Sequence, residues 1–69
     1  MTGREKLIAW LEETGIKQKW VAKKTRVSGQ SVSAWVTGRQ LPLLEHAVRL
    51  EAATGGAVKV ADWGPLIDA

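Results

Sequence analysis

The segment from residue 16 to residue 40 carries six cationic side chains and no carboxylate. These cations are Lys17, Lys19, Lys23, Lys24, Arg26 and Arg39. The flanking segments are mildly acidic, so the formal net charge of +3 is concentrated in this block. Cations without acidic neighbours are suited to binding phosphate groups, as in attachment to a nucleic-acid backbone. A charge run is also typical of a face that is simply solvated. The residues between the cations must therefore distinguish a nucleic-acid-binding face from a solvated one.

A group of small and polar residues directly follows Ser28. If a helix begins there, its outward positions are Gly29, Gln30, Ser33 and Ala34, and these would face base edges in a major groove. The amide of Gln30 can pair with adenine through two hydrogen bonds, which discriminates against a wrong base by about 1–3 kcal/mol. Ser33 can bond to many base edges, and Ala34 can contact a thymine methyl group. We therefore expect base discrimination to depend largely on Gln30.

Phosphate contacts would hold such a helix in place on DNA. Lysine and arginine supply charge, while glutamine, serine and the N–H groups at helix N-termini supply hydrogen-bond donors. The residues expected to contact phosphates are Lys17, Gln18, Lys19, Lys23, Arg26, Ser28, Ser31 and Arg39. Each neutralised phosphate should steepen the salt dependence of binding by about 0.9 on a log–log scale.

The residues that support catalysis or metal binding are scarce. The chain has no cysteine, and its single histidine, His46, is expected to be an ordinary surface or packed residue. No pair of carboxylates converges by spacing, so we predict no enzyme activity, no cofactor, no metal site and no small-molecule substrate. No apolar run approaches the ~18 residues of a membrane span. Together with the absence of cysteine, this favours a soluble, cytoplasmic protein that does not enter membranes.

The elements that would position these residues are short helices. A chain of 69 residues is expected to form one domain, 1–69, with a small core. The spacing of Thr2 and Glu5 is that of a capping box and predicts a helix over about 3–13. Apolar residues at helical spacing, bounded by glycine or proline, predict further helices over about 17–24, 28–37 and 43–53, with Pro42 in the first turn of the last. The expected fold is an all-α bundle of four to five short helices.

Apolar periodicity also predicts which side chains form the core. The expected core residues are Leu7, Ile8, Leu11, Val21, Ala22, Val32, Trp35, Val36, Leu44, Ala47, Val48 and Leu50. Trp10, Trp35 and Trp63 are expected to pack inside, because large aromatic side chains dominate small cores. Trp20 is different, since it lies among the lysines of the second helix and could be half-exposed at a partner surface.

The tail from residue 57 to residue 69 is ambiguous. Val58 and Val60 alternate with Lys59 as in a short strand, whereas Ala61, Asp62 and Trp63 could form one turn of helix. The turn is favoured, because nothing else in the chain is typical of a strand and a lone strand has no partner within the monomer. A second copy of the chain could supply one.

Residues 18–38 have the spacing of a helix-turn-helix. In this motif two helices cross steeply through a short turn, and a small residue must lie where their backbones approach. Ala22 occupies that position. The apolar residues that would fill the wedge between the helices are Val21, Val27, Val32 and Trp35.

The helix-turn-helix segment and the loop after it also carry a family resemblance. The residues that carry it are Gln18, Val21-Ala22, Val27-Ser28, Val32-Ser33, Trp35, and Gly38-Arg39 leading to Leu41-Pro42. Through them the chain resembles the Cro and repressor family of phage helix-turn-helix proteins, the Xre type. The later segment 52–58, followed by Asp62, is similar to the Cro-like YdaS subgroup, and the two likenesses span roughly residues 4 to 64.

The resemblance implies a lambda-repressor-like fold and a transcriptional repressor from a phage or prophage. It further implies binding to double-stranded operator DNA, often as a homodimer on two half-sites, with the dimer surface on the fourth helix or the tail. Gln18 and Arg39 match family positions. One departure concerns the turn, where the family commonly has glycine and this chain has Arg26. A left-handed conformation at Arg26 would cost roughly 1 kcal/mol relative to glycine.

A second hypothesis is a protein-interaction module, such as an antitoxin-like regulator that binds a partner protein. Its docking surface would be Trp20 or the tail around Trp63. An enzyme is the weakest hypothesis, because the side chains for general acid–base or nucleophilic chemistry are missing.

Overall fold

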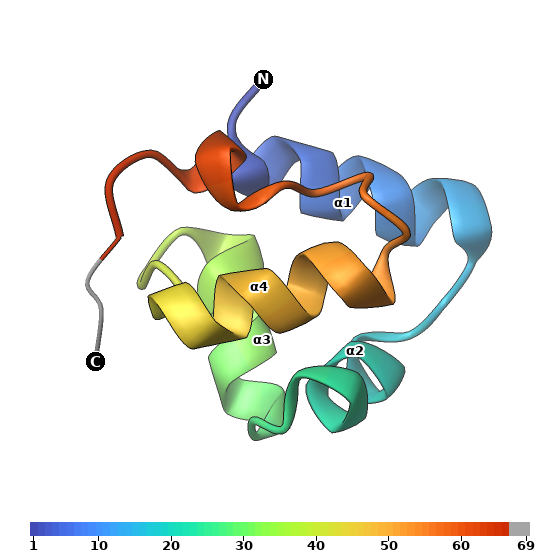
Figure 1. Cartoon of the computed structure of the whole chain (residues 1–69). Coiled ribbons are helices and arrows are strands. Elements are labelled where there is room, and N and C mark those ends of the chain that lie inside the picture. The colour runs from blue at the N-terminus through green and yellow to red at the C-terminus, as the bar shows by residue number, and fades with distance from the viewer. Residues whose placement is uncertain (67–69) are drawn as a thin grey trace.

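Four α-helices and a single 3-10 turn form the part of the chain that the computed structural model describes, residues 1–66 (Figure 1). In chain order they are α1 (Gly3–Thr14), α2 (Gln18–Thr25), α3 (Gly29–Thr37), α4 (Leu44–Ala53) and the 3-10 turn η1 (Val60–Trp63). No strand occurs within residues 1–66. The all-α prediction is confirmed, and each helix boundary lies within one residue of its expected position.

Side-chain caps explain where the helices begin. At α1 the Thr2 N–H donates to Glu5 Oε1 at 3.0 Å, and the Glu5 N–H donates to Thr2 Oγ1 at 3.2 Å, which confirms the capping box. At α3 the Ser31 N–H donates to Ser28 Oγ at 3.3 Å. The expectation for Pro42 was wrong: Leu43 is the N-cap of α4, so Pro42 lies outside the helix rather than in its first turn.

The core lies where α4 packs against α2, with α3 behind α4 and α1 along the other side (Figure 1). Its fully buried apolar residues are Leu7, Val21, Val32, Ala47, Leu50 and Val58. Val58 is an addition to the predicted core. The prediction for Val48 was wrong, because this side chain is 53 % exposed. At 100° per residue Val48 points away from the inward direction shared by Ala47 and Leu50.

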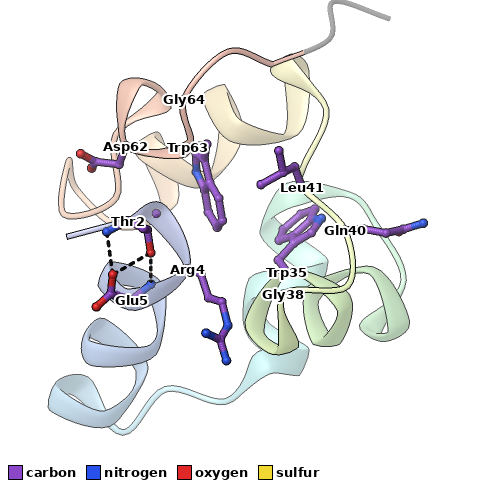
Figure 2. Close-up of a pocket in the computed structure, with 11 residues that line it drawn as sticks. Thr2, Arg4, Glu5, Trp35, Gly38, Gln40, Leu41, Asp62, Trp63 and Gly64 are labelled. Carbon is purple, nitrogen blue, oxygen red and sulfur yellow. Dashed lines mark hydrogen bonds between the residues drawn. The ribbon is translucent and has the colours of Figure 1, made fainter.

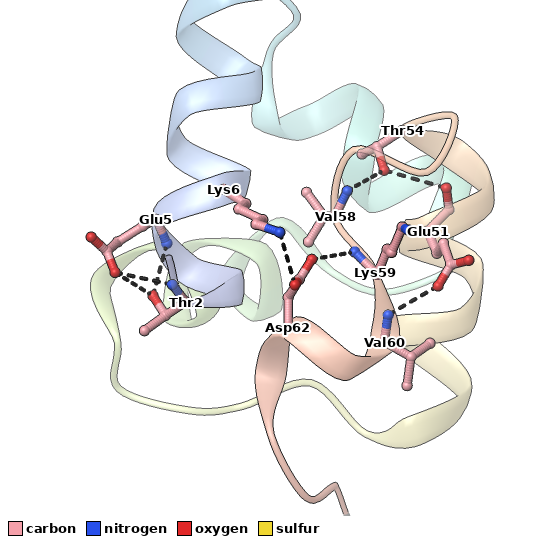
Figure 3. A network of polar contacts seen from close by, with 9 residues as sticks. All are labelled: Thr2, Glu5, Lys6, Glu51, Thr54, Val58, Lys59, Val60 and Asp62. Carbon is pink, nitrogen blue, oxygen red and sulfur yellow. Dashed lines mark hydrogen bonds and ion pairs between the residues drawn. The ribbon is translucent and has the colours of Figure 1, made fainter.

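The tail is joined to α1 and α4 by polar contacts (Figure 3). Lys6 Nζ and Asp62 Oδ1 are 2.9 Å apart, and the Lys59 N–H donates to Asp62 Oδ2 at 2.8 Å. The Val60 N–H donates to Glu51 Oε1 at 3.0 Å. These bonds shape η1 and confirm the turn of helix that was favoured over a strand; residues 67–69 of the tail lie outside the described part.

Trp63 covers the start of α1. It is buried, as predicted, and its ring lies so close to Gly3 that any Cβ at that position would overlap the indole. Trp35 is also buried, while Trp10 and Trp20 are partly buried against the core. Among residues 1–66, no helix combines the length and apolar character that crossing a membrane requires.

Candidate nucleic-acid interface

The turn between α2 and α3 is built around Arg26 and Ala22. Arg26 adopts the left-handed conformation, with φ 60° and ψ 42°, and thereby ends α2. The Val27 N–H then donates to the Ala22 carbonyl at 3.0 Å, and Ala22 itself is buried. The small side chain therefore lies where the chain turns back on α2, as the motif requires.

The first turn of α3 presents polar groups to solvent. Gly29 and Gln30 are exposed, and Ser33 is half-buried. The space around the Gly29 Cα is open, since a Cβ placed there would meet no atom within 4 Å. In the described chain the Gln30 amide takes part in no hydrogen bond, so its donor and acceptor are available to a ligand. Ser28 and Ser31 are joined through their hydroxyls at 3.3 Å.

Ala34 does not share this outward face, contrary to expectation. Only 7 % of it is exposed. Its carbonyl takes part in the C-terminal cap of α3, where it accepts from the N–H groups of Arg39 at 2.9 Å and Gln40 at 3.3 Å. The small exposed fraction of Ala34 means that its methyl group is covered by the protein itself and does not face a thymine methyl group.

The cations expected to meet phosphates are all exposed. They are Lys17, Lys19, Lys23, Arg26 and Arg39, and within residues 1–66 none of them forms a salt bridge. Gln18, the first residue of α2, is exposed as well. Lys17 is the N-cap of α2 but makes no side-chain cap, and the Trp20 N–H donates to the Lys17 carbonyl, so the N–H groups of Gln18 and Lys19 are left for an outside acceptor. The block is thus a surface of uncompensated positive charge.

A family model described as Helix-turn-helix matches residues 7–58, which is most of the chain. The chain belongs to the helix-turn-helix family of Cro/C1 type. Domains of this family are DNA-binding regulatory domains and not an enzyme family. No curated protein and no solved structure matches the chain significantly. The match begins within α1, includes α2, α3, α4 and the buried Val58, and stops before η1.

In this helix-turn-helix protein, the site residues divide between the two ends of α3. Lys23 lies in the last turn of α2, and Arg26 ends that helix three residues before Gly29, the first residue of α3. Arg39 follows Gly38 at the opposite end, beyond Thr37, which lies about 10 Å along the helix from Gln30 at 1.5 Å per residue. Its Nε donates to Thr37 Oγ1 at 3.2 Å. Arg39 therefore lies at the end of α3 opposite to Arg26.

Some residues that shape the helix-turn-helix were missed from sequence. Thr25 is fully buried, and its hydroxyl donates to the Val21 carbonyl at 2.8 Å, which satisfies a polar group inside the α2–α3 wedge. Arg49 of α4 donates from Nη1 to the Thr25 carbonyl at 3.4 Å. A threonine in the last turn of a short helix is the only sequence signal for this role.

A hollow of about 530 Å³ lies away from the first turn of α3, between the start of α1, the α3–α4 loop and η1 (Figure 2). The rings of Trp35 and Trp63 line it, and the Arg4 side chain beside it donates from Nε to the Val36 carbonyl at 2.7 Å. The indole N–H of Trp63 is buried without a partner within residues 1–66. These residues join three elements, and their observed contacts serve packing rather than DNA reading.

Proposed function

We propose that this helix-turn-helix protein is a sequence-specific, DNA-binding transcriptional repressor of Cro type, in the YdaS-like subgroup, that inserts α3 into the major groove of operator DNA. The observation that carries the proposal is the free amide of Gln30 on the exposed first turn of α3, beside cations that no carboxylate of the described chain neutralises. Such a surface suits a polyanion whose base edges offer hydrogen bonds.

Base discrimination in this proposal comes mainly from Gln30. Its amide pairs with adenine N6 and N7, and the half-buried Ser33 adds a less selective hydroxyl. Gly29 has open space and no side chain, so α3 can approach the bases closely. With Ala34 buried, nothing on this face is placed to recognise a thymine methyl group.

Affinity comes from the phosphate contacts. Lys17, Lys19, Lys23 and Arg26 supply charge, and the uncapped N-terminus of α2 at Gln18 supplies backbone donors. The Ser28 and Ser31 hydroxyls and Arg39 add contacts at the two ends of α3. Because these contacts are electrostatic, we propose a steep loss of affinity as salt concentration rises.

Replacing Gln30 with alanine tests the role of α3. We expect Gln30→Ala to weaken binding to the preferred operator by about 1–3 kcal/mol while nonspecific binding persists, because only the base contact is lost. Selection from a genomic library followed by fluorescence anisotropy on the selected duplex measures both quantities. Gln40→Ala is the matched control, since Gln40 is an exposed glutamine beyond the other end of α3. Unchanged operator preference in Gln30→Ala would place base reading elsewhere.

We also propose that the protein binds its operator as a homodimer through α4. Val48 supports this, because it is a large apolar side chain, 53 % exposed, on the outer face of that helix. We expect Val48→Glu to shift the dimer towards monomer without loss of helix content, as measured by sedimentation equilibrium and circular dichroism. Glu45→Gln, on the same helix, is the control for charge changes. If Val48→Glu leaves the oligomeric state unchanged, α4 is not the dimer surface.

A further inference from the structure

Trp20 lies between two hollows on the surface formed by α2, the turn before it and α4. The first hollow, of about 490 Å³, is lined by Ile16, Lys17, Lys19 and Lys23 in addition to Trp20. The second, of about 410 Å³, is lined by Lys24, Arg49 and Ala53 on the other side of the indole. We call these residues together the Trp20 surface. Its walls are mostly apolar, and its rim is cationic.

The indole of Trp20 is held in place. Its ring packs on Trp10 with 6.1 Å between the ring centroids and a tilt of 34°. The Lys24 ammonium group lies 5.5 Å from the Trp20 ring centroid, within the range of a cation–π interaction. A fixed, half-buried aromatic side chain loses little freedom on binding, which is a property of anchor residues at interfaces.

The charges around the indole define what would fit against it. Lys17, Lys19, Lys23 and Lys24 form no salt bridge within residues 1–66, and Arg49 pairs only with Glu45, at 3.7 Å. A second copy of this chain would bring the same cations and be repelled. DNA phosphates would match the lysines but leave the apolar hollow beside Ile16 unfilled. The complementary ligand carries carboxylates around a large apolar side chain.

We propose that the Trp20 surface binds an acidic, amphipathic segment of a partner protein. An apolar side chain of the partner fills the hollow between Ile16 and Trp20, and carboxylates pair with the lysines on the rim. Lys17, Lys19 and Lys23 are also the lysines assigned to phosphates, so the partner and DNA exclude each other. This last consequence rests on the proposed DNA-binding function, whereas the docking itself does not.

A designed peptide tests the docking. The probe is a fluorescein-labelled synthetic helix with one leucine stripe flanked by glutamates, titrated against the full chain in fluorescence polarisation. We expect Ile16→Ser to weaken binding about tenfold through lost apolar burial. We expect Lys24→Ala to weaken it about two- to fivefold. Lys59→Ala, which removes the same charge from the tail, is the matched control and should change nothing.

Two peptide controls separate specific docking from charge attraction. Replacing the glutamates by glutamines, or the leucines by glutamines, should each abolish measurable binding. Amide shifts in ¹H–¹⁵N spectra should map to residues 15–24 and 52–53. Binding that survives either replacement, shifts centred on residues 28–33, or equal dependence on Ile16 for a single-stranded oligonucleotide would overturn the proposal. Circular dichroism verifies that Ile16→Ser folds, and Lys24→Ala provides the test if it does not.

The competition is measured separately, by displacement of labelled operator with unlabelled peptide. We expect displacement from the wild-type chain and about two- to fivefold weaker displacement from Lys24→Ala, whose DNA affinity should be unchanged because Lys24 is not assigned to a phosphate. Peptide binding without any DNA binding would refute the proposed repressor function and leave the docking intact. DNA binding with no peptide binding would refute the docking alone.

Discussion

Arg26 is the only non-glycine residue of the described chain with a positive φ. The left-handed conformation crowds its Cβ against the backbone and costs roughly 1 kcal/mol relative to glycine. It nevertheless places an exposed cation at the corner between α2 and α3. Arg26 therefore lowers the stability of the fold relative to glycine, but it places a positive charge closer in sequence to α3 than the lysines of α2 are.

Glycine at position 26 should make the protein more stable and its DNA binding less dependent on salt. We expect Arg26→Gly to raise the free energy of unfolding by about 0.5–1 kcal/mol in urea denaturation, because the strain is removed. The slope of log affinity against log salt should fall by about 0.9 if Arg26 meets a phosphate. Lys23→Gly is the control, since glycine inside α2 should destabilise by about 1 kcal/mol. A destabilised Arg26→Gly would contradict the strain argument.

At the scale of elements, the starts of α1 and α3 resemble each other but have different neighbours. Gly3 and Gly29 each follow an N-cap residue, Thr2 and Ser28, and neither has a positive φ. The indole of Trp63 packs directly on Gly3, whereas nothing lies within 4 Å of a Cβ at Gly29. One helix start is thus a packing surface for η1, and the other is open.

The same substitution should therefore have opposite effects at these two glycines. Gly3→Ala should lower the free energy of unfolding by about 1–3 kcal/mol, because the new methyl group overlaps the Trp63 ring and η1 must shift. Gly29→Ala should raise it by about 0.4–1 kcal/mol through reduced freedom of the unfolded chain. Chemical denaturation of both variants measures the difference. Equal effects at the two positions would mean that Trp63 does not pack on α1 as described.

At the scale of the whole molecule, the packing of the tail against the helices depends on charged groups. The hydrogen bond from the Lys6 ammonium group, and next the Lys59 backbone N–H, lower the pKa of Asp62 below its ordinary 3.8. At the start of α1, hydrogen bonds from the Thr2 backbone and hydroxyl groups lower the pKa of Glu5 below 4.5. A carboxyl group with a lowered pKa stabilises the fold while it is ionised, above its pKa in the unfolded chain.

Acid should therefore weaken the fold in a defined range. As pH falls below about 3.8, the unfolded chain takes up a proton at Asp62 before the folded chain does, and the free energy of unfolding decreases until the folded pKa is passed. We expect Asp62→Asn to be less stable than wild type at neutral pH and to show a flatter decrease below pH 4. Thermal unfolding across the pH series measures both effects. Glu12→Gln is the control. If the free energy of unfolding of Asp62→Asn decreases in acid as much as that of wild type, Asp62 is not the source of the decrease.

Local interactions explain why most of the helical framework could be predicted from sequence. The Thr2–Glu5 capping box, the Ser28 cap and the glycines at 15 and 38 act within a few residues of each other. They specify where helices begin and end whatever packs against them. The exposure of Gln30 follows from helical periodicity around the buried Val32 and Trp35, and so the centre of the candidate site was also predictable.

Burial of Ala34 and Val58 was decided only by the tertiary structure, whereas the exposure of Val48 follows from its angular position on α4 relative to Ala47 and Leu50. Ala34 belongs to a helix that packs against α1 and α2, and only 7 % of it is exposed; Val58 is buried because the tail packs back onto the helices. The packing of Trp63 on Gly3 and the hollow between Trp20 and α4 likewise depend on residues distant in sequence. Periodicity specifies the direction of a side chain on its own helix, whereas burial depends on what else packs there. The sequence by itself thus determined the helices and the outward face of α3, and tertiary packing determined which neighbouring side chains remain available to a partner.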